Sequence, residues 1–391
     1  MSAKQVKRVG VIGGGQLAAM MASAAKKLGI ELAVQTPNAR DPAALVANQT
    51  IFAALDDVAA TAKLANLCDV ITFENEFINL DALITLAQKG VCFRPKLEVL
   101  APILDKYHQR CYLRDLGLPV PKFIVWEKNT PESPNTKISA SKQPLGFPVV
   151  MKARRHGYDG QGTLIIKQAS DLESNWQRWG YPSVLLEEFI PFERELAVIA
   201  ARFNSGEIVI YPIVETQQEN QVCRRVLVPI FLEPQVKGEI EAIARTLLES
   251  LKVVGLFAIE LFLTREGKVI VNEIAPRTHN SGHFSIDACF TSQFEMHLRA
   301  ICEYPIGNPA LNCAGAVMVN LLGFEYSQDD YQKKRQQLAE IPGAHVHWYG
   351  KAESRPGRKL GHVTVLLFDN EENLRAQAEA LALRCEEIWY G

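Results

Sequence analysis

Two glutamates, Glu260 and Glu273, are spaced in the sequence so that together they could hold a cation. They lie in two apolar segments, Leu256–Thr264 and Lys268–Ile274, which are joined at Glu266-Gly267. Glycine adopts the positive φ that a tight hairpin turn requires, so we expect an antiparallel hairpin here. If its loop has two residues, Glu260 and Glu273 are cross-strand partners on one face of the sheet.

Such a pair of carboxylates needs a neighbouring positive charge. At a separation of about 5 Å and an effective dielectric constant of about 20, the two charges repel by roughly 3 kcal/mol. Proteins bind Mg²⁺ through one or two carboxylates together with substrate phosphates, so the pair and the amide of Asn272 predict a Mg²⁺ site. The register alone also allows an exposed hairpin whose glutamates are solvated or paired with a lysine.

A glycine-rich segment, Gly157–Gly162, could cover phosphate groups. It follows an apolar strand that ends in Lys152 and precedes a second strand, Leu164–Lys167. Closely spaced glycines let backbone amides approach an anion and let a loop move, which favours a phosphate-covering flap. The spacing is not that of a P-loop, and a merely flexible hairpin is the alternative interpretation.

The apolar segment Val184–Ile190 carries two acidic residues and leads to a third. Glu187 and Glu188 lie inside it, and Glu195 comes shortly after it. A strand edge with free backbone groups and nearby carboxylates could bind an adenine and its ribose hydroxyls. Taken alone, however, the pattern favours an ordinary edge strand.

The N-terminal glycines indicate the start of a doubly wound α/β domain. Val9–Ile12 is a predicted strand, and Gly13-Gly14-Gly15-Gln16-Leu17 opens a helix whose backbone amides could meet an anion. A nicotinamide cofactor would also need an acidic residue at the end of the second strand. That strand ends in Val34-Gln35-Thr36-Pro37, so we do not expect a dinucleotide here.

A later strand of the same domain, Asp69–Phe73, is followed by two acids, Glu74 and Glu76. Ligands of doubly wound sheets collect at the carboxyl ends of the strands, so both side chains could line a cleft. Solvated loop acids are an equally good interpretation.

A basic segment near the C-terminus could bind a phosphate monoester. Four cations lie between Lys351 and Lys359, and Pro356-Gly357 makes the backbone between them rigid. Arginine and lysine clusters of this kind bind phosphate oxygens well. A solvated basic loop is the alternative, which the segment alone favours.

Composition excludes several classes of function. With 391 residues and 48% hydrophobic content, the chain should form two or three domains. A net charge of −2 with dispersed basic residues argues against nucleic-acid binding, and no segment has the pattern of a membrane span or signal peptide. The eight cysteines form no C-x-x-C pair, which suits reduced thiols in the cytoplasm.

These elements predict an α/β chain in three parts. We expect an N-terminal Rossmann-like domain over 1–104, a central domain over 105–305 with a flap subdomain at about 120–190, and a small α+β domain over 306–391. The amphipathic helix Gln235–Leu251 should pack under the glutamate hairpin. The polar segment Lys128–Pro144 is expected to be an exposed loop that tolerates change.

The order of these motifs resembles the ATP-grasp fold. More narrowly, GGGQL at 13–17, YDGQG at 158–162, NEIAPRTHNSGH at 272–283 and RPGRKLGH at 355–362 resemble the 5-(carboxyamino)imidazole ribonucleotide synthase family. The resemblance implies an ATP- and Mg²⁺-dependent ligase of purine biosynthesis that joins bicarbonate to 5-aminoimidazole ribonucleotide by way of carboxyphosphate. It also implies a homodimer, and a separate protein for the next step of the pathway.

The resemblance implies a role for each residue that matches a family motif. Contacts to ATP are implied for Lys106, Lys152, Gly157, Tyr158, Asp159, Gly160, Gln161, Gly162, Glu187, Glu188, Phe189, Ile190, Glu195, Gln218, Asn272 and Glu273. Mg²⁺ would be bound by Glu260 and Glu273. Contacts to the aminoimidazole ribonucleotide are implied for Gln16, Glu74, Glu76, Tyr158, Asp159, Lys351, Arg355 and Arg358. The residues implied near bicarbonate and its phosphorylated form are Arg277, His279 and Asn280, and Asp159 could orient the amine or accept its proton.

The chain departs from the common family pattern at a few positions. Ala275 stands where many ATP-grasp enzymes have a second metal-site residue, and we expect a bulge at Asn272 to compensate. Gln218 stands where a histidine is common, and Lys106 where arginine is more frequent. The common Glu-Phe-Glu-Asn order is Glu74-Asn75-Glu76-Phe77 here, which keeps both acids.

Other functions remain to be distinguished. A ligase like biotin carboxylase or the formate-dependent purine transformylase would share the ATP half but lack the basic C-terminal segment. A nicotinamide dehydrogenase would need the missing acid after the second strand. A non-catalytic nucleotide sensor would not need an intact carboxylate pair.

Overall fold

The structure is a computed structural model in which residues 6–127, 144–155, 157, 162–368 and 373–391 are described. Its first part is a parallel sheet in the order β3-β2-β1-β4. These strands are β1 (Arg8–Ile12), β2 (Glu31–Thr36), β3 (Gln49–Phe52) and β4 (Val70–Phe73). The helices of this part are α1 (Gln16–Leu28), η1 (Pro42–Leu45), α2 (Val58–Leu67), α3 (Leu80–Gln88) and α4 (Leu97–Leu100). The predicted doubly wound N-terminal domain is confirmed.

A helix from much later in the chain completes the core of this domain. Leu298 and Ile301 of α9 (Gln293–Ile301) pack against Leu17 and Met21 of α1. His297 of the same helix lies 2.9 Å from the hydroxyl of Thr72 in β4. The N-terminal sheet is therefore held against the centre of the molecule by buried contacts.

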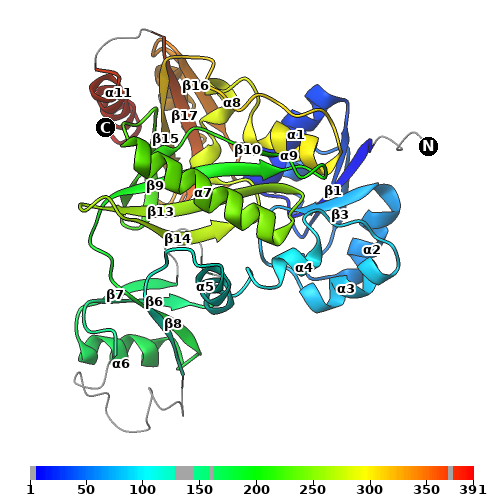
Figure 1. The fold of residues 1–391 in the computed structure, drawn as a ribbon. Helices are drawn as coiled ribbons and strands as arrows, with labels where there is room; N and C mark the ends of the chain where they lie inside the picture. The colour runs from blue at the N-terminus through cyan, green and yellow to red at the C-terminus, as the bar shows by residue number, and fades with distance from the viewer. Residues whose placement is uncertain (1–5, 128–143, 156, 158–161, 369–372) are drawn as a thin grey trace.

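A small antiparallel sheet forms a separate layer at the bottom of Figure 1, in the order β5-β8-β6-β7. Its strands are β5 (Phe123–Trp126), β6 (Val149–Ala153), β7 (Thr163–Ile166) and β8 (Val184–Glu188). Helix α6 (Ala169–Arg178) covers one face through Leu172 and Trp176. This sheet carries Lys152 and Glu187 toward the rest of the protein.

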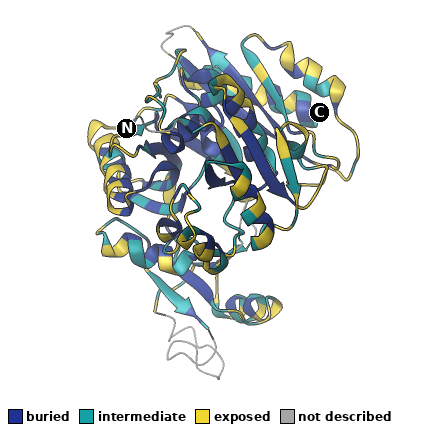
Figure 2. Cartoon of the chain, turned by 90° about the vertical axis from the view of Figure 1, so that its right-hand side faces the viewer, coloured by how far each residue is buried: buried dark blue, intermediate teal, exposed yellow. Residues whose placement is uncertain are grey.

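The largest sheet has nine strands, with the path β14-β13-β9-β11-β12-β15-β17-β16 and β10 paired with β9. Its strands are β9 (Phe192–Arg202), β10 (Ile208–Ile210), β11 (Val214–Glu219), β12 (Val222–Val228), β13 (Gly255–Thr264), β14 (Val269–Ala275), β15 (Gly315–Leu322), β16 (Ala344–Trp348) and β17 (Lys359–Leu367). Figure 2 shows that buried strands form its centre. Because β12 pairs with β15, one sheet spans the boundary that we predict near residue 306.

Helices cover this sheet on both faces. The remaining helices are α5 (Lys106–Asp115), α7 (Pro234–Leu251), η3 (Asn280–Gly282), α8 (Ser285–Ala288), α10 (Gln332–Ala339) and α11 (Leu374–Tyr390). Ile240 and Leu247 of α7 lie in one core cluster with Phe257 and Ile259 of β13, which confirms the predicted packing under the hairpin. None of the described helices has the length and apolar composition of a membrane span.

The β13–β14 hairpin confirms the pairing of Glu260 with Glu273, but the predicted two-residue loop is wrong. Thr264 donates its N–H to the carbonyl of Lys268 at 3.0 Å, so the loop consists of residues 265–267. The register shifts beside Glu260, where Asn272 is the extra residue of the predicted bulge. The longer loop and the bulge offset each other, so the two glutamates still face one another.

Candidate active site

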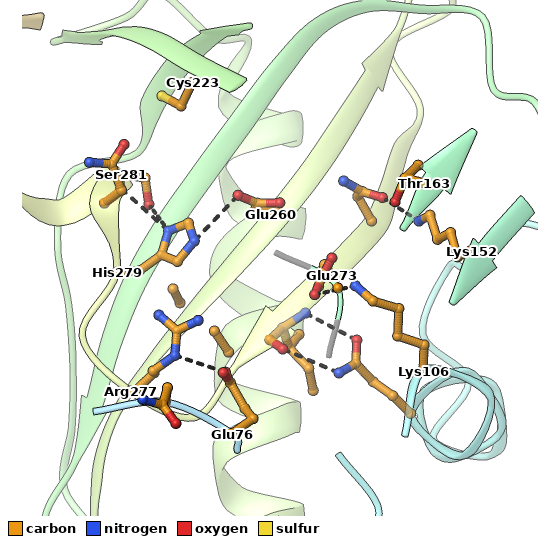
Figure 3. Close-up of a pocket in the computed structure, with 18 of the residues that line it drawn as sticks. Glu76, Lys106, Lys152, Thr163, Cys223, Glu260, Glu273, Arg277, His279 and Ser281 are labelled. Atoms are coloured by element: carbon orange, nitrogen blue, oxygen red, sulfur yellow. Dashed lines mark hydrogen bonds and ion pairs between the residues drawn. The ribbon is translucent and has the colours of Figure 1, made fainter. Parts of the chain in front are cut away.

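A cavity of about 730 Å³ lies where the three sheets approach one another. Its lining comes from the N-terminal glycine loop, strands β6 to β8, one face of the large sheet, and the segment after β14. Figure 3 shows the side chains that point into its centre. The cavity brings together most of the described residues that the sequence patterns selected.

One face of the large sheet supplies the acidic wall of the cavity. Glu195 pairs with Phe262 and Ala197 with Glu260, so these side chains and Glu273 lie on the same face. Gln218 of β11 hydrogen bonds to the carboxylate of Glu195, which brings the nucleotide-site residues predicted on β9 and β11 together.

Helix α5 holds the edge strand β14 in place. The side-chain amide of Gln109 accepts from the N–H of Ile274 and donates to its carbonyl, each at 3.2 Å. Arg110 donates to the backbone carbonyl of Asn272. The ammonium group of Lys106 lies 2.5 Å from the carboxylate of Glu273. Sequence reasoning missed Gln109 and Arg110, because nothing local in α5 indicates which strand it meets.

A buried charge cluster connects the small sheet to this edge. The Lys152 ammonium lies 2.7 Å from Glu187 and donates to the Asn272 side chain at 3.1 Å. Arg110 binds the other carboxylate oxygen of Glu187. Burial opposes ionisation of Glu187, but Arg110 and Lys152 outweigh it and lower its pKa to about 2. The Glu187 carboxylate therefore fixes the position of Lys152.

The two glutamates of the hairpin have different electrostatic surroundings. Burial disfavours the charge of Glu273, but Lys106 and Lys152 outweigh it and lower its pKa. For Glu260, burial is reinforced by the charges of Glu273 and Glu195, which raise its pKa to about 7. The charge of Glu260 is thus under-compensated by its neighbouring side chains, two of which are themselves acids.

This charge imbalance fits a bound cation. A divalent ion between Glu260 and Glu273 would relieve their repulsion, and hard carboxylate oxygens suit Mg²⁺. Within the described residues, no group of three or more His, Cys, Asp or Glu side chains could hold a metal by itself. The donor set therefore suits a cation that is shared with a phosphate ligand.

The segment after β14 places basic groups beside these carboxylates. Arg277 donates to Glu76 of the N-terminal domain at 2.8 Å, and His279 Nε2 lies 3.6 Å from Glu260 (Figure 3). The amide of Asn280 is paired with that of Asn320 at 2.9 and 2.7 Å. Arg277 and His279 thus face the centre of the cavity, whereas the Asn280 amide is engaged in a buried contact.

The N-terminal glycine loop is occupied by a side chain of the protein itself. Glu74 accepts from the backbone N–H groups of Gly15 at 2.6 Å, Leu17 at 3.0 Å and Ala18 at 3.3 Å. A Cβ on Gly13 would lie 2.4 Å from the Cβ of Glu74. Glycine is therefore required for this approach, and the anion that we expect at the start of this helix is Glu74.

Comparison with known proteins decides the family. Models of three domains match: a ribonucleotide synthetase preATP-grasp domain over 6–103, an ATP-grasp domain over 111–294, and a phosphoribosylaminoimidazole carboxylase C-terminal domain over 316–377. The N5-carboxyaminoimidazole ribonucleotide synthase of Synechococcus elongatus is 54% identical over 98% of this chain and 96% of its own. The chain belongs to the N5-carboxyaminoimidazole ribonucleotide synthase family. It is an ATP-grasp ligase.

Other synthases of this family agree in sequence and in fold. The Bacillus subtilis synthase is 37% identical, and the alignment covers 93% of this chain and 92% of that one. The structure from Thermotoga maritima has a TM-score of 0.84 at 39% identity and covers 98% of both chains. A structure from Aspergillus clavatus in complex with ADP and 5-aminoimidazole ribonucleotide has a TM-score of 0.87 at 28% identity and covers 99% of both chains. The predicted family and ATP-grasp fold are confirmed.

The residues predicted to bind the ribonucleotide fall into two groups. The basic residues near the C-terminus lie apart from the acidic and polar residues of the N-terminal domain. Gln16, Glu74 and Glu76 line the cavity, but Lys351, Arg355 and Arg358 do not. Arg358 donates to the carbonyl of Glu353, and Arg355 is exposed. Lys359 lines the cavity instead, and it is only 7% exposed. The sequence analysis counted Lys359 among the four cations of the basic segment but assigned it no role. Lys359 is the first residue of strand β17.

The flap of this chain is only partly described. Gly157 lines the cavity, and Gly162 has a φ of +79°, where its carbonyl accepts from the N–H of Ala153 at 2.7 Å. The predicted contacts of residues 158–161, which are Tyr158, Asp159, Gly160 and Gln161, lie outside the described residues. The apolar residues Phe189 and Ile190 follow β8 and line the cavity.

Proposed function

We propose that this chain carboxylates 5-aminoimidazole ribonucleotide with bicarbonate, converts ATP to ADP and phosphate, and forms N5-carboxyaminoimidazole ribonucleotide. The observation that carries the proposal is the facing pair of Glu260 and Glu273, with Lys106 and Lys152 beside it. This group lies in a single cavity that also reaches Glu76 of the N-terminal domain.

The nucleotide is proposed to lie between the small sheet and the large one. Phe189, Ile190 and the stacked rings of Phe192 and Phe262, whose centroids are 4.6 Å apart, offer an apolar wall for adenine. Backbone N–H and C=O groups near Glu188 would hydrogen bond to the edge of the adenine. Glu195 and Gln218 lie farther along the same wall and suit the ribose hydroxyls.

The phosphates are proposed to meet cations of the protein and a bound Mg²⁺. Lys152 is oriented by Glu187, and Lys106 by Glu273, so both ammonium groups are held before the ligand arrives. Glu260 and Glu273 would hold Mg²⁺, which supplies charge neutralisation to the phosphate oxygens when it is bound. Asn272, placed by the bulge, is a further oxygen donor on the same side.

The chemistry requires positioning and charge neutralisation more than a protein nucleophile. Bicarbonate is a poor electrophile at neutral pH, so its phosphorylation to carboxyphosphate makes the later attack by the amine possible. Arg277 and His279 can donate to the oxygens on which negative charge accumulates. Because carboxyphosphate hydrolyses readily, we assign the exclusion of water to the flap around Gly157.

The ribonucleotide is proposed to lie against the N-terminal domain. Gln16 and Glu76 would contact the aminoimidazole part, and Asp159 would orient the amine or accept its proton. Glu74 supports this wall from behind, because its carboxylate is bound to the helix N-terminus. The family resemblance assigns the 5′-phosphate to Lys351, Arg355 and Arg358.

We further propose that the protein acts in the cytoplasm as a homodimer. None of the eight cysteines, all of which lie in the described part of the chain, forms a disulfide, and burial raises the pKa of Cys68 and Cys302 to about 12. Such thiols are protonated and unreactive, which suits a reducing compartment. Sedimentation at micromolar concentration tests the oligomeric state.

The decisive experiment measures ADP release while each substrate is omitted in turn. Turnover should require ATP, Mg²⁺, bicarbonate and 5-aminoimidazole ribonucleotide together, and a ¹³C-bicarbonate label should appear in the carbamate product. ADP release that is independent of the ribonucleotide would contradict the proposal. Retained ATP binding without turnover would favour a sensor.

A further inference from the structure

One side chain of the cavity, the imidazole of His283, has no part in the function proposed above. The residue is only 1% exposed, and it lines the cavity together with Lys359. Its ring packs against those of Phe294 and His362, with centroid distances of 5.6 and 5.1 Å. Its Nδ1 atom lies 3.0 Å from Nε2 of Gln293, whereas its own Nε2 has no hydrogen-bond partner in the described part of the chain.

The backbone of His279 fixes which way the amide of Gln293 points. Oε1 of Gln293 accepts from the N–H of His279 at 2.9 Å, and Nε2 donates to the carbonyl of the same residue at 2.7 Å. Reversing the amide would set donor against donor and acceptor against acceptor in a site where Gln293 is completely buried. The atom of Gln293 that faces His283 is therefore the nitrogen.

The orientation of Gln293 determines the tautomer of His283. An amide nitrogen can only donate, so Nδ1 of His283 accepts and carries no proton. A neutral imidazole with a free lone pair on Nδ1 carries its proton on Nε2. Burial, followed by the charges of Lys359 and His279, lowers the pKa of His283 well below its ordinary value, so the ring stays neutral.

We propose that His283 binds a substrate oxyanion through its neutral Nε2–H group, beside Lys359, and that Gln293 is the positioning residue that holds this tautomer. The inference rests on the function proposed above, in which the oxyanion is either the 5′-phosphate of the ribonucleotide or bicarbonate. The ammonium group of Lys359 attracts the oxyanion, and the hydrogen bond from the fixed imidazole orients it. In this tautomer Nε2 cannot accept a proton, so His283 is not the base that removes the proton from the amine.

The first test is the ¹⁵N spectrum of histidine-labelled full-length protein without substrates. His283 should show a protonated Nε2 and an unprotonated Nδ1, with the signals assigned by their loss in His283→Gln. A ring that is protonated on Nδ1 would overturn the inference, whatever the enzyme does in an activity assay. Inorganic phosphate, bicarbonate and the ribonucleotide are then added separately. A shift of the Nε2 proton with bicarbonate or with a phosphate identifies the source, and no shift with any of them would overturn the inference.

The second test compares two variants in steady-state kinetics. His283→Gln keeps an N–H donor close to the position of Nε2, whereas His283→Leu removes it. We expect KM for the ribonucleotide or for bicarbonate to rise about 10- to 100-fold in His283→Leu, because the lost hydrogen bond is to a charged group, and to rise much less in His283→Gln. Equal increases in the two variants would mean that the ring only packs, which contradicts the inference.

The matched control is His347→Gln. His347 stacks on His362 with a centroid distance of 4.5 Å, hydrogen bonds to Asp287 at 2.8 Å, is partly exposed, and does not line the cavity. The KM values of the His347→Gln variant for the ribonucleotide and for bicarbonate should equal those of the unmodified protein. The requirement of the unmodified protein for the ribonucleotide tests the proposed function separately, so a failure of either idea can be recognised.

Discussion

Two regions of this molecule bring carboxylates to the ligand cavity, and they balance the charge differently. At the N-terminal glycine loop, the carboxylate of Glu74 accepts from three backbone N–H groups of the chain itself. At the β13–β14 hairpin, Glu260 faces Glu273, and Nε2 of His279 lies 3.6 Å from the carboxylate of Glu260. Burial raises the pKa of both carboxylates, but at Glu74 the hydrogen bonds of the chain oppose that rise, whereas at Glu260 the charges of Glu273 and Glu195 add to it.

This difference predicts that Glu74 stabilises the fold and that Glu260 binds a ligand. A buried carboxylate that accepts several hydrogen bonds from the chain, as Glu74 does, stabilises one arrangement of neighbouring segments. A charge that the neighbouring groups leave under-compensated lowers the stability of the folded protein, and a bound ligand of opposite charge can restore that stability. Both acids lie in conspicuous sequence motifs, so motif strength alone does not distinguish them.

The largest expected effect comes from removing the charge of Glu260. Glu260→Gln keeps the shape of the side chain but removes half of the proposed cation site, and turnover should fall about 10³-fold, equivalent to about 4 kcal/mol. Global stability should not fall, because the substitution also relieves repulsion. Initial rates and urea unfolding measure the two effects. Glu266→Gln, at the exposed turn of the same hairpin, is the control, and a variant that keeps a tenth of the activity would contradict the comparison.

Glu187 should behave as an acid that the chain compensates fully. Glu187→Gln leaves Arg110 and Lys152 without their buried partner, and we expect a loss of about 3 kcal/mol in the free energy of unfolding at neutral pH. The folded pKa of about 2 lies below the ordinary 4.5, so this stabilisation is present above pH 4.5 and declines as the pH falls toward 2.

Urea unfolding of the two proteins at neutral pH and at progressively lower pH checks this prediction. The gap between the unmodified protein and Glu187→Gln should narrow with acidification. The control is Glu193→Gln, which changes an exposed acid at the start of β9 and should show no such gap in the free energy of unfolding. A constant gap at every pH would mean that Glu187 acts by packing and not by charge.

Glu74→Gln tests the hydrogen bonds between the Glu74 carboxylate and the backbone of the glycine loop. The amide can accept through only one oxygen, so part of the helix cap is lost, and we expect the free energy of unfolding to fall by about 2 kcal/mol. Turnover should fall less than in Glu260→Gln. If turnover falls by a thousandfold while stability is unchanged, Glu74 contacts the substrate and the contrast between the two sites is wrong.

The smallest effect is expected at the glycines themselves. A Cβ on Gly14 would lie 2.4 Å from the Cβ of the buried Thr36, so Gly14→Ala should destabilise the protein by about 1 kcal/mol or more. Gly238→Ala in α7 has open space around the new Cβ and should be neutral or stabilising, because alanine favours a helix. Thermal unfolding of the two variants measures the difference, and equal shifts would remove the steric argument.

Much of the site could be predicted because its signals are local. The hairpin carries its own turn glycine and alternating pattern, so the pairing of Glu260 with Glu273 follows from a short stretch of chain. Even there the loop length was wrong, and the pairing survived only because Asn272 forms a bulge. Local patterns therefore identify partners better than they identify turn geometry.

The contacts that position the site could not be predicted, because they join distant segments. Gln109 and Arg110 of α5 bind β14, and Gln293 of α9 orients His283, yet no periodicity in either helix marks these side chains. Lys359 and Arg358 are adjacent in the sequence, but only Lys359 lines the cavity. The composition of such a segment shows that it is basic, but it does not show which of its side chains line the cavity.

By itself, the sequence determined the α/β class, the ATP-grasp motifs, the acidic hairpin and the family. Each of these depends on residue type and on spacing within one segment, which sterics and hydrophobic periodicity control directly. Only the tertiary structure decided which acid is compensated from within, which lysine reaches the cavity and which tautomer His283 adopts. Those properties depend on the groups that the fold brings into contact, and the energy of a buried charge or hydrogen bond is set by such neighbours.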